Sequence, residues 1–147
     1  MKKFVNRVIN ILLVEDSPSE VRLTQEAFKN SRLPNTICVA NDGIQAMAFL
    51  NKEGIHKDVP LPDLILLDLN MPRKDGFAVL ADIKSNSKFR MIPVIILTTS
   101  DTESDINKSY DLHANCYIIK PVGFDKFVNV IKQIEDFWFT IVQLPAK

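Results

Sequence analysis

Cysteine and histidine are scarce in this chain of 147 residues, which contains two of each. Cys38 and Cys116 are far apart, and neither belongs to a CxxC pair. We therefore expect two small side chains packed inside strands in a reducing compartment, rather than a disulfide or a thiolate metal site. His56 and His113 also lack the spacing of metal ligands, and we expect both at the surface.

An excess of charge of one sign is also missing. The 18 basic residues balance the 18 acidic residues, so the net charge is zero, and the calculated pI is about 6.7. Because binding to a nucleic-acid duplex depends on clustered Lys and Arg, we expect no nucleic acid as a partner.

Long apolar runs are absent too. No stretch approaches the ~18 residues that a membrane-spanning helix requires. The opening MKKFVNRVIN lacks the apolar segment of a signal peptide. The sequence therefore predicts no membrane association and a cytoplasmic location.

The sequence does contain five short apolar runs, separated by amphipathic segments. The runs are Ile9–Val14, Thr36–Ala40, Leu64–Leu67, Val94–Leu97 and Cys116–Ile119. Nearly continuous Ile, Leu and Val favour strands that are buried on both faces, as in a parallel sheet covered by helices. The pattern predicts an α/β fold, a doubly wound five-stranded parallel sheet of the (βα)5 type with helices on both faces. We expect a single domain over 1–147, with its core at about 8–136 and an aromatic extension of the fifth helix at about 137–147.

Polar residues directly follow four of these runs. They are Glu15-Asp16, Asp68, Thr98-Thr99 and Lys120-Pro121. The carboxyl ends of parallel strands meet at one edge of a sheet, so these side chains should converge on one pocket. Crowded carboxylates repel one another, and Mg²⁺, which prefers oxygen ligands, would relieve that repulsion. A lysine and a threonine hydroxyl suit phosphoryl oxygens, so the set indicates phosphoryl transfer to an aspartate nucleophile.

Each of these residues also has an ordinary structural explanation. Asp16 would cap the first helix, and Asp68 would end a strand ahead of a turn. Thr98 would be a plain strand residue, and Lys120 a solvated lysine before a loop proline. The functional interpretation is favoured because all four occur in order, each at the end of an apolar run.

Four motifs resemble those of the receiver domains of two-component response regulators. They are LLVEDSP, LLDLNMPRKDG, ILTTS and YIIKP, and the resemblance covers about residues 8–136. It implies a flavodoxin-like fold in which a histidine kinase phosphorylates Asp68. Asp16 would bind Mg²⁺ directly, Glu15 would act mainly through metal-bound water, and the backbone carbonyl of Asn70 would complete the protein's share of the metal ligands.

The resemblance also implies roles on the phosphoryl side of the pocket. Thr98 and Lys120 would bind phosphoryl oxygens, and Pro121 would follow a cis peptide bond. Tyr117 would be the aromatic side chain that moves with the threonine, which links phosphorylation to the face of the fourth helix, fifth strand and fifth helix. The side chains of Asn70 and Ser100 would flank the path of the attacking water and so set the lifetime of the phosphoryl group.

The C-terminal segment is rich in apolar residues. One set recurs at helical spacing and should face the sheet: Phe127, Ile131, Ile134 and Trp138. A second set has no obvious core to occupy: Phe124, Val128, Val130, Phe137, Phe139 and Ile141. Large exposed apolar patches mark interfaces, so we expect a symmetric homodimer through the face of the fourth and fifth helices. Its residues would be Phe124, Val128, Val130, Phe137 and Ile141. The alternative is a longer fifth helix that folds back over the body with Leu144.

The ending IEDFWFTIVQLP and the long loop Ile55–Pro62 support a narrower resemblance. They resemble the small response regulators that are paired with bacterial and cyanobacterial phytochromes. This resemblance implies a phytochrome as the kinase partner.

Three other functions use a comparable architecture. A phosphohydrolase of the haloacid-dehalogenase type needs a second aspartate two positions after the nucleophile, where this chain has Asn70. A flavodoxin-like electron carrier needs a phosphate loop rich in hydroxyl groups and glycine, whereas EDSPSE is acidic. A receiver-like binding module that is never phosphorylated usually lacks an acid, the aspartate or the lysine, and all are present here. We therefore expect a signalling switch that catalyses only its own phosphorylation and slow dephosphorylation, with the binding module as the main alternative.

Overall fold

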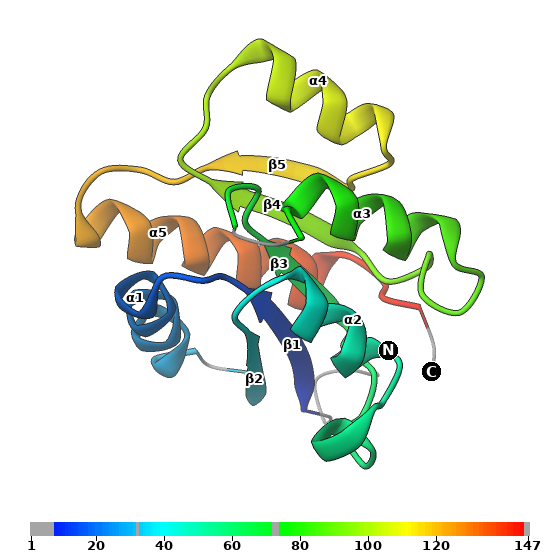
Figure 1. The fold of residues 1–147 in the computed structure, drawn as a ribbon. Coiled ribbons are helices and arrows are strands. Elements are labelled where there is room, and N and C mark those ends of the chain that lie inside the picture. The colour runs from blue at the N-terminus through cyan, green and yellow to red at the C-terminus, as the bar shows by residue number, and fades with distance from the viewer. Residues whose placement is uncertain (1–7, 32, 72–73, 146–147) are drawn as a thin grey trace.

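A computed structural model describes residues 8–31, 33–71 and 74–145 (Figure 1). Within them, five strands form one parallel sheet in the order β2-β1-β3-β4-β5. The strands are β1 (Ile9–Val14), β2 (Asn35–Ala40), β3 (Leu64–Leu67), β4 (Val94–Thr98) and β5 (Cys116–Ile119). This is the predicted flavodoxin-like, doubly wound order, and each strand bound lies within one residue of the corresponding apolar run.

Helices cover both faces of the sheet, as Figure 1 shows. One face carries α1 (Pro18–Lys29) and α5 (Phe124–Glu135), which lie side by side. The other face carries α2 (Gly43–Leu50), α3 (Gly76–Ser85) and α4 (Glu103–Asp111), and a 3-10 turn, η2 (Gly54–His56), lies between α2 and β3.

A polar side chain caps each of the first four α-helices. These caps are Ser17, Asp42, Asp75 and Thr102, and each accepts a hydrogen bond from a backbone N–H in the first turn. Each of these caps lies directly before the first residue of its helix.

Alternate residues of each central strand fill two separate core layers. In β1, Ile11 and Leu13 pack toward α1 and α5, whereas Leu12 and Val14 pack toward α2 and α3. All four residues of β3 are completely buried. Burial of each such side chain stabilises the fold by ~1.5–3 kcal/mol. The buried strands therefore hold the residues at the edge of the sheet in fixed positions.

The C-terminal segment differs from the prediction. After α5, the chain continues as a π-helical segment, η3 (Asp136–Ile141), in which the N–H of Val142 donates to the carbonyl of Phe137 at 2.9 Å. Phe139 is completely buried and lies 6.4 Å from Phe28, ring centroid to ring centroid. Trp138 is only partly buried. Phe139 was expected in the surplus set but is a core residue, whereas Trp138, expected against the sheet, packs against the same core only in part.

A lysine joins the starting ends of β4 and β5 to α3. The Lys84 ammonium donates to the carbonyls of Arg90 at 3.0 Å and Ile92 at 2.9 Å, and to the side-chain oxygen of Asn115 at 3.0 Å. The same Asn115 oxygen also accepts the backbone N–H of Val94 at 2.9 Å. Four segments therefore meet at one network at the end of the sheet opposite the strand carboxyl ends.

Both cysteines are free thiols and half-buried, and burial raises the pKa of each. His113 is exposed, whereas His56 is half-buried, with its ring 5.3 Å from that of Phe49. Among the described residues, none of the helices combines the length and apolar character needed to cross a membrane.

Candidate functional site

The strand register brings the predicted polar residues to one edge of the sheet. Val14 of β1 pairs with Leu67 of β3, so Asp68 comes directly beside the end of β1, and its N–H donates to the carbonyl of Val14 at 3.0 Å. Thr98 pairs with Ile119, so Lys120 comes directly after the neighbouring strand end. The edge therefore carries acidic residues from β1 and β3 and a hydroxyl and an ammonium from β4 and β5.

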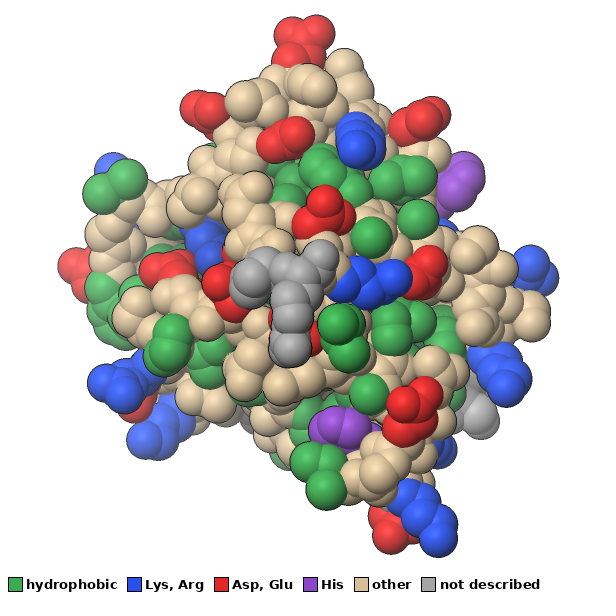
Figure 2. All heavy atoms as spheres, viewed as in Figure 1, with side chains coloured by type: hydrophobic (Ala, Val, Ile, Leu, Met, Phe, Trp, Pro, Cys, Tyr) green, Lys and Arg blue, Asp and Glu red, His purple; other side chains and the backbone are tan. Residues whose placement is uncertain are grey.

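Glu15, Asp16 and Asp68 form an acidic cluster at this edge. One carboxylate oxygen from each lies within 4.8 Å of the others. Glu15 and Asp68 are 3% and 8% exposed, whereas Asp16 is open to solvent. In Figure 2, acidic side chains gather near the centre of the face, beside the grey atoms.

Burial disfavours the charged form of Glu15. Loss of solvent raises the pKa of this carboxyl from 4.5 to about 6; the Lys120 ammonium opposes the rise and the Asp68 charge adds to it. A buried carboxylate with a raised pKa, next to a second carboxylate, favours binding of a positive charge.

The cluster fits a divalent cation. The oxygen ligands of an octahedral Mg²⁺, with bonds of about 2.1 Å, lie about 3.0 to 4.2 Å apart. The three carboxylate oxygens all lie within 4.8 Å of one another, so one ion could take an oxygen from each. One of the three is exposed, which leaves room for water and a phosphoryl oxygen in the remaining coordination positions.

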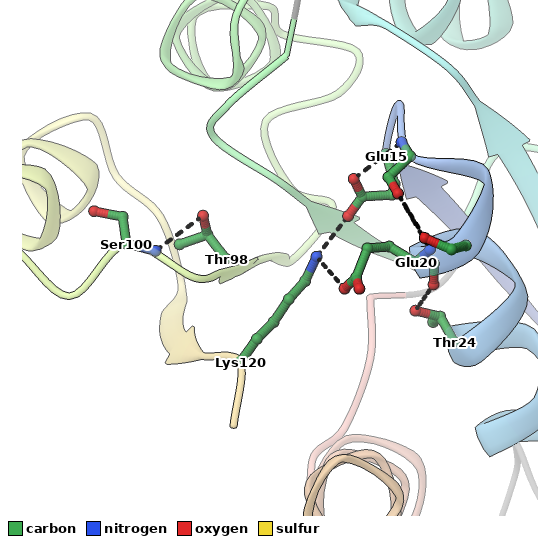
Figure 3. A network of polar contacts seen from close by, with 8 residues as sticks. Glu15, Glu20, Thr24, Thr98, Ser100 and Lys120 are labelled. Atoms are coloured by element: carbon green, nitrogen blue, oxygen red, sulfur yellow. Dashed lines mark hydrogen bonds and ion pairs between the residues drawn. The ribbon is translucent and has the colours of Figure 1, made fainter. Parts of the chain in front are cut away.

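The ammonium of Lys120 lies between two glutamates, as Figure 3 shows. Its Nζ is 2.6 Å from Glu15 Oε1 and 3.1 Å from Glu20 Oε1. Burial alone would lower the pKa of Lys120, but the hydrogen bond and charge of Glu15, with the Asp68 charge and the Glu20 contact, raise it overall. Lys120 is therefore a charged group at this edge, as a phosphoryl-binding residue must be.

Sequence reasoning missed Glu20 as a site residue. Glu20 was considered only as the last residue of the acidic segment EDSPSE, yet its side chain contacts the Lys120 ammonium. The available signal was its place in the first turn of the helix that follows β1, because that turn lies at the same edge as Glu15.

Thr98 and Tyr117 contact the same loop, the one between β4 and α4. Thr98 is completely buried, and its hydroxyl accepts the N–H of Ser100 at 3.5 Å. The hydroxyl of the half-buried Tyr117 donates to the carbonyl of Ser100 at 2.9 Å. The hydroxyl of Ser100 donates to Asp105 of α4 at 2.6 Å. One loop residue thus links the pocket, β5 and α4.

The prediction for Pro121 is wrong. The described residues contain no cis peptide bond, so Lys120 and Pro121 are joined in the trans form. The trans isomer of a bond before proline is intrinsically favoured by ≈ 0.5–1 kcal/mol. Lys120 reaches both glutamates from this trans geometry. Asn70 is exposed in the loop after Asp68, and its carbonyl as a metal ligand remains a prediction.

A glycine allows the chain after β3 to pass close to the start of α3. A Cβ at Gly76 would lie 2.4 Å from the carbonyl oxygen of Asp68 and 2.6 Å from the Cα of Leu69. The N–H of Gly76 donates to the carbonyl of Leu69 at 3.0 Å. Gly76 therefore helps to fix the backbone of Asp68. Pro72 and Arg73, which belong to the same motif, lie outside the described residues.

The predicted dimer residues divide into two groups. Phe124, Phe137 and Ile141 are 47%, 49% and 68% exposed. Val128 and Val130 are half-buried and pack against the protein's own core. The first three remain candidates for an interface, and the two valines offer less surface to a partner than the sequence suggested.

Comparisons with known proteins agree with this geometry. The family model described as "Response regulator receiver domain" matches residues 11–132. Response regulator Rcp1 of Synechocystis sp. is 48% identical over 136 residues, which cover 92% of both chains.

Two solved structures are closely similar. The phosphorylated cyanobacterial phytochrome response regulator RcpA is 47% identical, with a TM-score of 0.91, over 95% of this chain and 100% of its own. The Mn²⁺-bound form of Rcp1 is also 47% identical, with a TM-score of 0.88, over 94% of this chain and 99% of its own. Matches of this extent, together with the acidic pocket, show that the chain belongs to the receiver-domain family of response regulators, which are signalling switches rather than true enzymes.

Proposed function

We propose that Asp68 accepts a phosphoryl group from a histidine kinase while Glu15 and Asp16 help to hold Mg²⁺ beside it. The acidic cluster carries this proposal, because three carboxylates within 4.8 Å at the end of β3 join a metal site to a nucleophile. A related structure binds Mn²⁺ and another is phosphorylated, which supports the same chemistry here.

The reaction requires little covalent chemistry from the protein. An Asp68 oxygen attacks the phosphorus of phosphohistidine, the P–N bond breaks, and the electron pair returns to the imidazole. Bound Mg²⁺ would neutralise charge on the phosphoryl oxygens. Lys120 supplies an ammonium for a phosphoryl oxygen, and the Thr98 hydroxyl donates to another once its loop moves.

The phosphoryl group on Asp68 carries roughly −1.5 to −2 charges, next to Thr98. The Thr98 hydroxyl at present accepts the N–H of Ser100, whose carbonyl holds the Tyr117 hydroxyl. A shift of Thr98 toward the phosphoryl group therefore moves the point to which Tyr117 is bound. The signal reaches the face of α4, β5 and α5 as a shift between two populations of this loop.

The kinase partner is proposed from the relatives. Because RcpA is described as a phytochrome response regulator, we propose a phytochrome as the histidine kinase of this chain. The test is phosphoryl transfer from the purified, autophosphorylated phytochrome kinase of the same organism. Transfer at the rate seen with an unrelated kinase would contradict the pairing.

We also propose a homodimer that buries Phe124, Phe137 and Ile141, since these large side chains remain exposed on α5 and η3. Figure 2 shows hydrophobic side chains at the left edge of this face, near the start of α5. Phe124→Ala with Phe137→Ala should weaken the dimer in sedimentation. Ile55→Ala is the control, because Ile55 is 91% exposed on the loop between α2 and β3. An unchanged oligomer in the double variant would show that this interface is wrong.

The main experiment is intact-mass analysis after incubation with acetyl phosphate, with and without Mg²⁺. Wild type and Asp58→Asn, a loop control, should gain one acid-stable, base-labile phosphoryl group only with Mg²⁺, and Asp68→Asn should gain none. Absence of the adduct in folded wild type at saturating Mg²⁺ would favour a binding module that is never phosphorylated.

A further inference from the structure

The Lys120 ammonium is held on the α1 side of the pocket. Its ion pairs are with Glu15 at 2.6 Å and Glu20 at 3.1 Å, and in the described part of the chain no ion pair joins it to Asp68. Figure 3 shows Thr98 and Ser100 on the opposite side of this ammonium from Glu20. The lysine that should bind the phosphoryl group is thus engaged by two other carboxylates.

Glu20 differs from Glu15 in its position. Glu15 belongs to the acidic cluster, whereas Glu20 lies in the first turn of α1, outside that cluster. The N–H of Glu20 donates to the Ser17 hydroxyl at 3.4 Å, and its carbonyl accepts the Thr24 hydroxyl at 2.9 Å. The backbone of Glu20 is therefore fixed, and its carboxylate is presented to Lys120 from a defined point.

The surroundings give Lys120 room to change partners. A groove of about 250 Å³ adjoins the ion pair and is lined by Glu20, Lys120, Thr99 and Phe124, among others. The Glu20 side chain is 36% exposed and that of Lys120 is 7% exposed, so the contact is partly screened by solvent. A contact of this kind is strong enough to orient a flexible side chain and weak enough to be exchanged for a phosphoryl oxygen.

We propose that Glu20 is a positioning residue that holds Lys120 in a resting orientation and competes with the phosphoryl group for its ammonium. This inference rests on the proposed phosphorylation of Asp68. Glu20 stabilises the unphosphorylated form only, because Lys120 must leave it to reach the phosphoryl oxygens. An interaction that stabilises only one of two states lowers the population of the other. Glu20 therefore lowers the fraction of protein in which Lys120 is free to bind the phosphoryl oxygens.

The test is the affinity for beryllofluoride, a phosphoryl mimic that binds the aspartate with Mg²⁺. Glu20→Ala should bind it about threefold more tightly than wild type, which is ~0.7 kcal/mol at 1.4 kcal/mol per factor of ten. Glu26→Ala is the matched control, since Glu26 is an exposed carboxylate on the same helix that pairs with Lys29 at 3.8 Å. Equal affinities in the two variants, or weaker binding by Glu20→Ala, would overturn the proposal.

A second comparison asks whether Glu20 acts through Lys120. In a Lys120→Gln background, Glu20→Ala should leave the beryllofluoride affinity unchanged. A threefold gain that persists there would mean that the Glu20 charge acts directly on the anion, and the positioning role would be wrong. In metal-free buffer, Glu20→Ala and Lys120→Gln should also be coupled in urea unfolding, and zero coupling would contradict the contact itself.

Failure of the proposed function has a different signature. Wild type that binds no beryllofluoride and forms no phosphoryl adduct would refute phosphorylation at Asp68. Normal wild-type binding without the difference between Glu20→Ala and Glu26→Ala refutes only the role of Glu20.

Discussion

Replacement of Phe139 by alanine tests whether the C-terminal segment is part of the protein's own core. Phe139 is completely buried and stacks beside Phe28 at 6.4 Å between ring centroids. Truncation of a fully buried phenylalanine costs ~3–5 kcal/mol, from lost burial and the cavity that remains. We expect a decrease of that size in the free energy of unfolding, measured by urea denaturation at several protein concentrations.

Ile55→Ala is the control for Phe139→Ala. Ile55 is 91% exposed and lies outside the proposed dimer interface, so its loss should change the unfolding free energy by ~0.5 kcal/mol or less. The reasoning would be refuted by a loss below ~1 kcal/mol in Phe139→Ala, because well-packed core sites do not tolerate such a deletion. A midpoint of Phe139→Ala that depended on concentration more steeply than wild type would place its contacts in a partner chain instead.

Three further predictions follow from contacts at the site. Burial raises the pKa of Glu15 from 4.5 to about 6, so between these pH values the native metal-free protein keeps a proton that the unfolded chain has released. The unfolding free energy should therefore fall as pH rises from about 4.5 to about 6. Glu15→Gln should remove this pH dependence when unfolding is measured in EDTA. Gly76→Ala should cost ~1–3 kcal/mol in urea unfolding and weaken Mn²⁺ binding, since its Cβ would press on the Asp68 carbonyl from 2.4 Å; a neutral effect on both would contradict the close approach. Tyr117→Phe removes the hydrogen bond to Ser100 and should lower the free energy of unfolding in urea by ~0.5–1.5 kcal/mol. An unchanged free energy of unfolding would show that this bond is not formed in solution.

The sheet was predictable because of the way parallel strands are buried. β3 is covered on both faces, so its four residues are all apolar and completely buried, and the run Leu64–Leu67 marks the strand without ambiguity. The first strand is just as clear, because Glu15 interrupts the apolar run where the strand ends.

The C-terminal segment was not predictable from helical spacing. In an α-helix, the position four residues after Ile134 is Trp138, which is why Trp138 was expected to face the sheet. The chain adopts the wider π-helical turn there, and the residue five positions after Ile134 is the buried Phe139. Both side chains are large and aromatic, so composition offered no way to choose between the two spacings.

The site was predictable to the extent that it depends on strand ends. Asp68 and Lys120 follow strands, so topology alone brings them to one edge. Glu20 was missed because its role depends on how α1 packs against the end of β5, which is a tertiary contact. The isomer of the bond before Pro121 was predicted only from family resemblance, and the chain itself contains no local signal for it.

The Lys84 network has a mechanical consequence for the switch. Lys84 and Asn115 fasten the starting ends of β4 and β5 to α3, whereas Thr98 is the last residue of β4 and Lys120 directly follows β5. Each strand is therefore anchored at its starting end and leads to the pocket at its carboxyl end. Displacement caused by phosphorylation should be larger near the carboxyl ends than near the anchored ends. The size of the movement should depend on the stability of the distant Lys84 network.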